Sequence, residues 1–131
     1  MILFAAVICF SFGCSSGNDE IKVITVSEFA ENVKQDTTAF ILDVRTPEEF
    51  AESHIEGATN INIKDEIGFN DGIKTLNKSK TYYIYCRSGR RSHNAALKMQ
   101  KEGFKVFDME GGINAWKEAK MPIETSVESA E

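Results

Sequence analysis

The chain has 131 residues, of which 42% are hydrophobic and 27% are charged, and its formal net charge is −5. This length suits one domain, and the composition is that of an ordinary soluble globular fold. The negative net charge and the lack of a basic tract in the sequence argue against nucleic acid as a partner.

The N-terminus begins with an apolar run at residues 1–14, which is too short to span a bilayer as a helix. Such a run is typical of a signal-peptide core. Its last residues, SFGC, resemble a bacterial lipobox, in which the cysteine (here Cys14) is lipidated and becomes the new N-terminus, although Ser11 stands where leucine is usual. Residues 15–20 then predict a flexible tether. We therefore expect a lipid anchor on a bacterial envelope membrane, facing the periplasm or the cell surface. A cleaved secretory signal and an uncleaved anchor are the alternatives.

The first elements after the tether are short and have clear boundary signals. Residues 21–26 predict a strand, and Ser27 is a suitable N-cap for the helix that follows it. Residues 40–44 are a continuous apolar run around one aspartate, which indicates a buried parallel strand. At residues 46–49, Thr-Pro-Glu-Glu combines an N-cap, a proline at the first helical position and an acidic first turn. This pattern predicts a short helix that ends near Ser53.

The second half of the chain continues the alternation of strands and helices. The predicted elements are a strand at 58–63, an ambiguous helical pattern at 67–76, a strand at 81–85, a helix from about 90 to a stop at Gly103, a strand at 105–109 and a short helix at 113–119. Residues 124–131 form a polar tail that we expect to be disordered. The alternation predicts an α/β fold with a central, mostly parallel sheet of about five strands and helices on both faces.

The most informative segment is the junction between the strand at 81–85 and the next helix. Cys86 closes the strand, and residues 87–91 form a short loop that is small in the middle and basic at both ends. Loop amides and a helix N-terminus both favour negative charge at such a point. The thiolate of a cysteine there is suited to nucleophilic attack. The alternative is a buried structural cysteine, which does not need a polar glycine loop and a helix start behind it.

Four segments resemble, in order, the motifs of the single-domain rhodaneses, which are sulfurtransferases. They are residues 42–50 (LDVRTPEEF), 54–61 (HIEGATNI), 86–92 (CRSGRRS) and 111–116 (GGINAW). The resemblance covers residues 21–123 and implies a rhodanese-like domain in which Cys86 carries a sulfane sulfur as a persulfide. It implies no metal and no cofactor. The implied partners are a small anionic sulfur donor such as thiosulfate and a thiol or cyanide acceptor.

The resemblance also suggests roles for residues around Cys86. The residues that would hold the donor in the loop are Arg87, Ser88, Gly89, Arg90, Arg91 and Ser92. We expect Arg87 to face the anion, and Arg91 to point into the protein and pair with an acid. Arg45 either lines the mouth of the site or pairs with a carboxylate such as Glu49, and we favour the structural role. Structural roles are also expected for Asp43, His54 and Trp116.

Two other functions remain as alternatives to sulfur transfer. The first is a rhodanese-like module that binds or regulates without catalysis, although such modules commonly lose the cysteine that is present here. The second is a phosphatase or arsenate reductase of the same fold. Those enzymes place a catalytic arginine at the position that Ser92 occupies, whereas Arg91 comes one residue earlier. The shorter loop favours a sulfur atom over a tetrahedral phosphate.

Overall fold

The computed structural model describes residues 20–125, in which strands and helices alternate as predicted, except that an unpredicted strand, β3, directly precedes β4. The strands are β1 (Val23–Ile24), β2 (Ala39–Asp43), β3 (His54–Ile55), β4 (Thr59–Asn60), β5 (Thr81–Tyr85), β6 (Lys105–Met109) and β7 (Ile123–Glu124). The helices are α1 (Val26–Gln35), α2 (Pro47–Glu52), α3 (Glu66–Lys74), α4 (Arg90–Lys101) and α5 (Gly112–Glu118).

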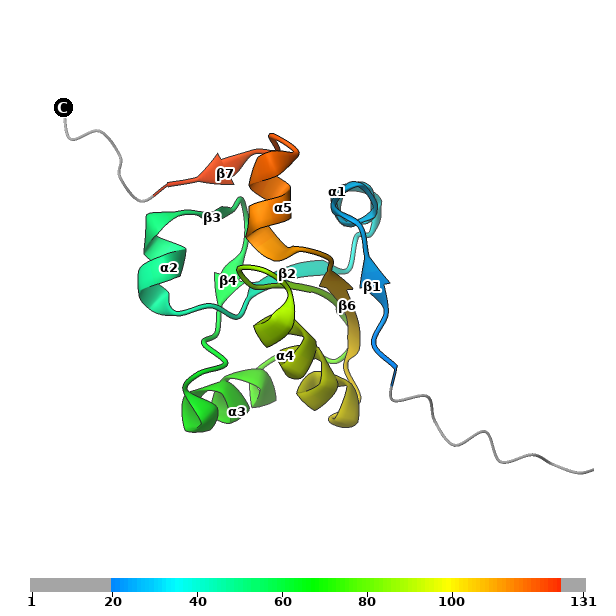
Figure 1. The fold of residues 1–131 in the computed structure, drawn as a ribbon. Coiled ribbons are helices and arrows are strands. Elements are labelled where there is room, and N and C mark those ends of the chain that lie inside the picture. Colours follow the sequence, from blue (N-terminus) through cyan, green and yellow to red (C-terminus); the bar gives the residue numbers. More distant parts are fainter. Residues whose placement is uncertain (1–19, 126–131) are drawn as a thin grey trace, which may run out of the picture.

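A central sheet organises the fold. Its five strands are all parallel and lie in the order β1-β6-β5-β2-β4, with β5 in the middle. Helices α1 and α5 lie on one face of this sheet and α3 and α4 on the other (Figure 1). The predicted α/β fold, with a parallel sheet of five strands and helices on both faces, is therefore confirmed. Strands β3 and β7 form a separate antiparallel pair.

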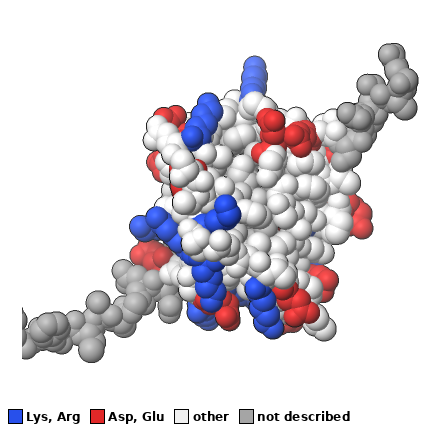
Figure 2. All heavy atoms as spheres, turned by 180° about the vertical axis from the view of Figure 1, so that it is seen from behind, with Lys and Arg blue, Asp and Glu red and all other residues white. Residues whose placement is uncertain are grey.

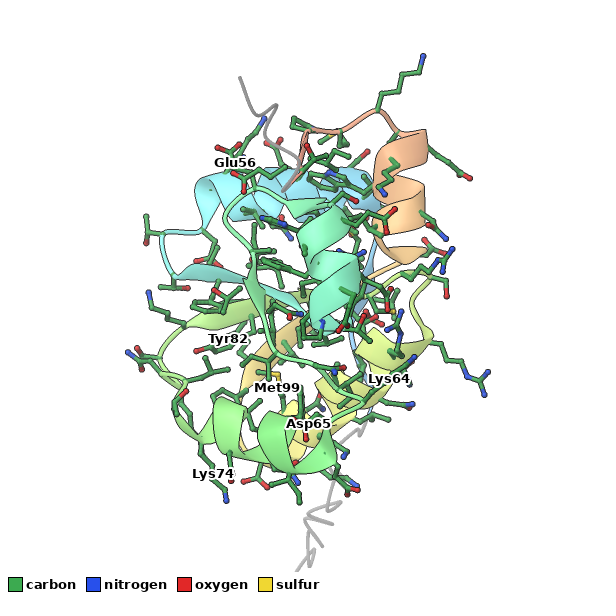
Figure 3. All side chains as sticks on the ribbon, turned by 90° about the vertical axis from the view of Figure 1, so that its left-hand side faces the viewer. Glu56, Lys64, Asp65, Lys74, Tyr82 and Met99 are labelled. Carbon is green, nitrogen blue, oxygen red and sulfur yellow. The ribbon has the colours of Figure 1, made fainter. Side chains whose placement is uncertain are left out.

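Strand β5 contributes to the hydrophobic core on both faces of the sheet, because successive side chains of a strand point in opposite directions. Tyr82 and Ile84 pack with Met99 of α4 in one cluster. Figure 3 shows Tyr82 and Met99 in the interior, above α3. Tyr83 and Tyr85 pack in the other cluster, which contains Trp116 of α5. All five residues of β5 are buried, so the segment that ends at the predicted nucleophile is firmly held.

Local signals set where the first two helices begin. Thr46 caps α2, since its hydroxyl accepts a hydrogen bond from the Glu49 amide, and Pro47 follows at the start of the helix as predicted. Helix α1 begins earlier than predicted. Its N-cap is Thr25, so Ser27 lies within the first turn instead of preceding the helix.

The segment that was ambiguous in the sequence, residues 67–76, forms helix α3 over most of its length. Asp65 caps this helix, with its carboxylate accepting a hydrogen bond from the Gly68 amide. Gly72 allows a close contact, because a Cβ there would lie 3.0 Å from the side chain of Ile61. The two glycines that weaken the helical pattern thus belong to the cap and to the packing of α3.

The C-terminal strand β7 differs from the prediction. Ile123–Glu124 pairs with β3, and Oε2 of Glu124 lies 2.9 Å from Nε2 of His54. Glu124 therefore belongs to the fold and not to the predicted tail at 124–131. The remainder of that tail from residue 126, the signal peptide predicted at 1–14 with its lipidation site Cys14, and the tether up to residue 19 lie outside the described residues.

The surface of residues 20–125 carries charges of both signs. On the face behind that of Figure 1, the basic and acidic side chains lie mainly around the rim, and a broad central area is uncharged (Figure 2). None of the helices described is both long enough and apolar enough to cross a membrane.

Candidate active site

The candidate site lies at the carboxyl ends of neighbouring strands. β5 pairs along its whole length with β2, and Asp43 at the end of β2 is level with Tyr85 at the end of β5. Cys86 and Val44, which follow these residues, therefore leave the sheet at the same edge. Ligands of parallel α/β sheets bind beyond this edge. The structure thus brings the Cys86 loop next to the segment that carries Arg45.

Cys86 lies at the bottom of the loop that begins α4. Its side chain is almost fully buried, and its Sγ atom accepts a hydrogen bond from the Gly89 amide at 3.0 Å. Gly89 has a φ of 111°, which side-chain-bearing residues rarely adopt, and it is the N-cap of α4. The sulfur is therefore held by a backbone amide at the positive end of a helix, where negative charge is stabilised.

The backbone of the loop is oriented by helix α5. The carbonyl of Cys86 accepts a hydrogen bond from the Ile113 amide at 2.8 Å, and the carbonyl of Arg87 accepts one from the Asn114 amide at 3.1 Å. In a trans peptide the carbonyl and the next amide point in opposite directions. The amides of Arg87 and Ser88 are therefore directed away from α5.

Gly112 makes this contact between α5 and the loop possible. A Cβ at this position would lie 2.5 Å from carbonyl atoms of both Cys86 and Arg87. In the sequence, Gly111-Gly112 belongs to the fourth motif without a role of its own, so its position beside the nucleophile was missed. The sequence signal for this contact is the second glycine, Gly112. A turn alone needs only one glycine, so a second one indicates a close approach of another backbone.

Arg91 connects the loop to α2. Its guanidinium donates two hydrogen bonds to the Glu49 carboxylate, at 2.7 and 2.9 Å. These bonds, which burial opposes in part, lower the pKa of Glu49 to about 2 and raise the pKa of Arg91. The prediction that Arg91 points inward and pairs with an acid is confirmed. The pair fixes the first turn of α4 against α2.

Arg45 is a structural residue, but its partner is not the predicted one. Its guanidinium pairs with Asp43 at 2.7 Å and donates to the carbonyl of Ser53 at 2.6 Å. Both charged side chains are at least 96% buried. The Glu49 carboxylate accepts its two arginine hydrogen bonds from Arg91 instead. The Arg45 guanidinium is thus enclosed by protein groups and does not line the mouth of the site.

The other predicted loop residues divide into exposed and buried ones. Arg87, Ser88 and Arg90 are exposed, so their side chains are accessible from solvent. Ser92 is fully buried, and its hydroxyl donates to the carbonyl of Gly89 at 3.1 Å. Its side chain therefore faces the protein interior and does not face the mouth.

Three residues predicted to be structural have those roles. Asp43 accepts a hydrogen bond from the backbone amide of Arg45 at 2.9 Å. His54 stacks on Phe50 at a ring distance of 3.9 Å. Trp116 is buried, and its indole donates to the Pro122 carbonyl at 2.8 Å.

Comparisons with known proteins place this arrangement in a family. Residues 25–119 match the family described as Rhodanese-like domain. YtwF of Bacillus subtilis, provisionally named a sulfurtransferase, is 37% identical over 103 residues, which are 79% of this chain and 97% of YtwF. Thiosulfate sulfurtransferase GlpE of Pseudomonas putida is 30% identical over 105 residues, covering 79% of this chain and 92% of GlpE.

A solved structure agrees with the sequence comparisons. The crystal structure of a rhodanese-related protein from Thermoplasma volcanium has a TM-score of 0.71 and 31% identity to this chain, covering 79% of this chain and 97% of the other. The chain therefore belongs to the rhodanese-like domain family and has the rhodanese-like fold.

Proposed function

We propose that this protein is a sulfurtransferase that carries a sulfane sulfur on Cys86. It takes the sulfur from a small anionic donor such as thiosulfate and passes it to a thiol or to cyanide. The family supports this proposal, since relatives with sulfurtransferase names are about one third identical to the chain. The position of Cys86 at the start of α4 supports it as well.

The reaction has two displacements. The thiolate of Cys86 attacks the outer sulfur of thiosulfate, the sulfur–sulfur bond of the donor breaks, and sulfite leaves with the electron pair. Cys86 then carries a persulfide with a negative terminal sulfur. In the second displacement the acceptor attacks that terminal sulfur, which leaves as thiocyanate or as a new persulfide, and the Cys86 thiolate is regenerated. Each displacement moves one neutral sulfur atom from one nucleophile to another. The reaction therefore needs no external oxidant or reductant.

The observation that carries the proposal is the 3.0 Å hydrogen bond from the Gly89 amide to Cys86 Sγ. The amides of Arg87 and Ser88 are directed away from α5 because their preceding carbonyls are bonded to it. A preorganised amide such as that of Gly89 stabilises an anionic sulfur without reorganisation during the reaction. The exposed Arg87 and Arg90 supply positive charge to attract an anionic donor.

The ion pair between Arg91 and Glu49 favours sulfur transfer over phosphoryl transfer. A phosphatase loop needs a guanidinium that is free to hold the phosphoryl oxygens. Here the guanidinium of Arg91 is bonded to both carboxylate oxygens of Glu49, and Ser92 offers no positive charge. A binding module without catalysis has no use for a thiol at a helix N-terminus, and we therefore rank it below the enzyme.

A lipid anchor at Cys14 is a second, separate part of the proposal. It rests on the sequence of residues 1–20 alone: an apolar run, a lipobox-like end and a polar tether. The domain would then act on sulfur compounds in the bacterial envelope, in the periplasm or at the cell surface.

The test of the sulfurtransferase proposal is the intact mass of the purified full chain after treatment with thiosulfate. We expect a gain of one sulfur atom at Cys86, located by peptide mass, and its loss when cyanide is added. Parallel incubations with an aryl phosphate and with arsenate test the alternative enzymes. Turnover of either compound without persulfide formation contradicts the proposal.

A further inference from the structure

Helix α4 carries more positive charge than the proposed mechanism uses. None of its residues is acidic, although the chain has a net charge of −5, and its basic residues are Arg90, Arg91, Lys98 and Lys101. Lysines in the last turn stabilise a helix through its dipole, but an arginine in the first turn opposes the dipole. Arg91 is compensated by its ion pair with Glu49, whereas Arg90 forms no ion pair within residues 20–125. Helix stability alone therefore does not explain the charge at the start of α4.

A groove of about 420 Å³ lies along the later turns of α4. It is lined by Asn94, Leu97, Lys98 and Lys101 of the helix and by Ile63, which belongs to the segment between β4 and α3. Figure 3 shows the next residue of this segment, Lys64, beside α4. Leu97 and Ile63 are half-buried, and neither lysine of the groove forms an ion pair with another residue of the described part of the chain. The groove thus combines two apolar side chains with two uncompensated positive charges.

The helix side of this groove begins at the active site. One face of α4 is formed by residues that are spaced three or four apart, namely Arg90, Asn94, Leu97 and Lys101. Arg90 directly follows Gly89, whose amide donates to Cys86 Sγ at 3.0 Å. This face of α4 therefore runs from the loop that holds the sulfur to the basic end of the helix.

The opposite side of the groove is also connected to the active site. The Ile63 amide donates to the Val44 carbonyl at 3.0 Å, and the Val44 amide donates to the Tyr85 carbonyl at 3.1 Å. Tyr85 is the residue before Cys86, so the Ile63 segment leaves the sheet at the same edge as the nucleophile. Because both sides of the groove lead to Cys86, a chain that lies in the groove can reach the mouth of the loop.

The depth of Cys86 and the length of α4 indicate the shape of the occupant. The side chain of Cys86 is 1% exposed, so the thiol of an acceptor has to enter the loop to meet the sulfur. An extended chain segment can enter, whereas a flat protein surface cannot. From Arg90 to Lys101 the helix rises about 16 Å at about 1.5 Å per residue, and an extended chain covers this length in about five residues.

We propose that this α4 groove docks an extended acidic segment of a protein whose thiol accepts the sulfur from Cys86. The basic residues of the groove are complementary to carboxylates, and its two apolar side chains add contact area. The thiolate of the partner attacks the terminal sulfur of the persulfide, the sulfur–sulfur bond breaks, and Cys86 leaves as a thiolate with the electron pair. The thiol of the partner becomes a persulfide, so no oxidant or reductant is needed. This inference rests on the sulfurtransferase role of Cys86.

The test uses the full chain, loaded with sulfur from thiosulfate, and two synthetic cysteine peptides as acceptors. The first peptide has a cysteine at one end and a pair of aspartates about five positions away, which is the distance from the thiol to the basic end of α4. The second has asparagines in place of the aspartates. Each is made with the cysteine at the N-terminus and at the C-terminus, so that both chain directions are tested. The rate of transfer to each peptide is measured by mass and divided by the rate of transfer to cyanide.

We expect the acidic peptide to accept sulfur about fivefold faster than the neutral one in one of the two directions at low salt, since two exposed ion pairs together are worth roughly this factor. The ratio of the two rates should fall towards one as salt is added, because salt screens exposed charges. A ratio near one in the parent at low salt, in both directions, overturns the inference.

Two double variants locate the effect. Lys98→Gln with Lys101→Gln should bring the ratio close to one. Lys34→Gln with Lys117→Gln is the matched control, because these lysines also lie in last helical turns but on α1 and α5, at the other face of the sheet (Figure 1). The control makes the same change in net charge and should leave the ratio as in the parent. Thermal unfolding first shows that both variants are folded, and an equal ratio in the two variants overturns the inference.

A binding measurement separates this inference from the proposed function. Serine replaces cysteine in both peptides, and the fluorescence anisotropy of labelled peptides then reports docking without any sulfur chemistry. If the acidic peptide binds more tightly and loses this advantage in the Lys98→Gln, Lys101→Gln protein, while thiosulfate forms no persulfide, the docking surface stands and the proposed function fails. If sulfur is transferred to cyanide but both peptides bind equally, the function stands and the inference fails. Tighter binding of a single-stranded oligonucleotide of equal charge through the same lysines would contradict an acidic protein as the occupant.

Discussion

The arginines around Cys86 have different surroundings, and this difference decides what each can do. Arg45 and Arg91 are held by carboxylates, whereas Arg87 and Arg90 are exposed. A guanidinium that already donates to a carboxylate of the protein has fewer donors left for a substrate than an exposed one. We therefore propose that the exposed pair recognises the anion, whereas Arg45 and Arg91 stabilise the fold through their carboxylate partners.

The Arg91–Glu49 pair should stabilise the fold in a pH-dependent way. The pKa of Glu49 is lowered from an ordinary value to about 2 by Arg91, so the stabilisation is fully present above the unfolded-state pKa. It is lost as the pH falls towards about 2. Both side chains are about four-fifths buried, and we expect Glu49→Gln to lower the free energy of unfolding at neutral pH by about 1–2 kcal/mol.

The measurement for this pair is urea unfolding of the parent and of Glu49→Gln between pH 7 and pH 3. Glu48→Gln is the matched control, since Glu48 lies beside Glu49 on α2 but is exposed. The difference from the parent should shrink with falling pH for Glu49→Gln and should stay near zero for the control. A difference in the free energy of unfolding that grows as the pH falls would contradict the proposed stabilisation by the ionised Glu49 carboxylate.

The Arg45–Asp43 pair should be much more sensitive to loss of one partner. Both groups are buried, and Arg45→Met leaves the Asp43 carboxylate without its counter-ion. We expect this change to cost about 3–5 kcal/mol of stability, as is usual when one member of a buried pair is removed. Thermal unfolding of the variant measures this cost. Normal stability combined with loss of thiosulfate binding would instead support Arg45 as a substrate residue.

The sequence identified the residues of this site but not all of their partners. Cys86, Gly89 and Arg91 follow from the loop pattern, because strand, loop and helix start are adjacent in the chain. The partner of Arg45 depends on how the backbone bends after β2, which turns the guanidinium back onto Asp43.

At the scale of elements, the active-site loop depends on the start of α5. Two amides of α5 hold the carbonyls of Cys86 and Arg87, and Gly112 allows the backbones to approach. We expect Gly112→Ala to destabilise the domain and to reduce persulfide formation at least tenfold, since a Cβ there overlaps backbone atoms of the loop. The measurements are thermal unfolding and the rate of persulfide formation.

Gly57→Ala is the matched control for this change. Gly57 also has a positive φ, of 80°, but a Cβ there meets nothing within 4 Å. It should therefore cost only the strain of the left-handed backbone, about 1–2 kcal/mol, and leave sulfur transfer by the folded protein unchanged. Equal effects of the two substitutions on transfer would show that the contact between α5 and the loop does not position the nucleophile.

Elements with strong local signals were predicted well, and those fixed by distant contacts were not. Helix α2 has its cap, its proline and its acidic turn within four successive residues from Thr46. Strand β7 has only two residues, and its partner β3 lies far back in the chain, so no local pattern indicates it. Glu124 lies in a strand because its backbone pairs with β3, and its side chain also contacts His54.

At the scale of the whole molecule, the proposed lipid anchor at Cys14 makes a testable prediction about the membrane attachment of the protein. If Cys14 is lipidated, Cys14→Ala should release the protein from the membrane fraction, because acylation needs that sulfur. Cys9→Ala is the matched control, since Cys9 lies within the apolar run and should leave membrane attachment unchanged. Fractionation of cells that express the tagged variants measures the effect. A Cys14→Ala protein that stays in the membrane would favour an uncleaved anchor.

The central claim is that Cys86 carries the transferred sulfur, and Cys86→Ser tests it most directly. Serine replaces one atom and should preserve the fold, but it cannot form a persulfide. The measurement is the transfer of sulfur from thiosulfate to cyanide by the parent and the variant, after thermal unfolding has shown both to be folded. We predict that the parent produces thiocyanate through a Cys86 persulfide and that the variant produces none above the uncatalysed rate. Undiminished transfer by the folded Cys86→Ser protein would contradict the account.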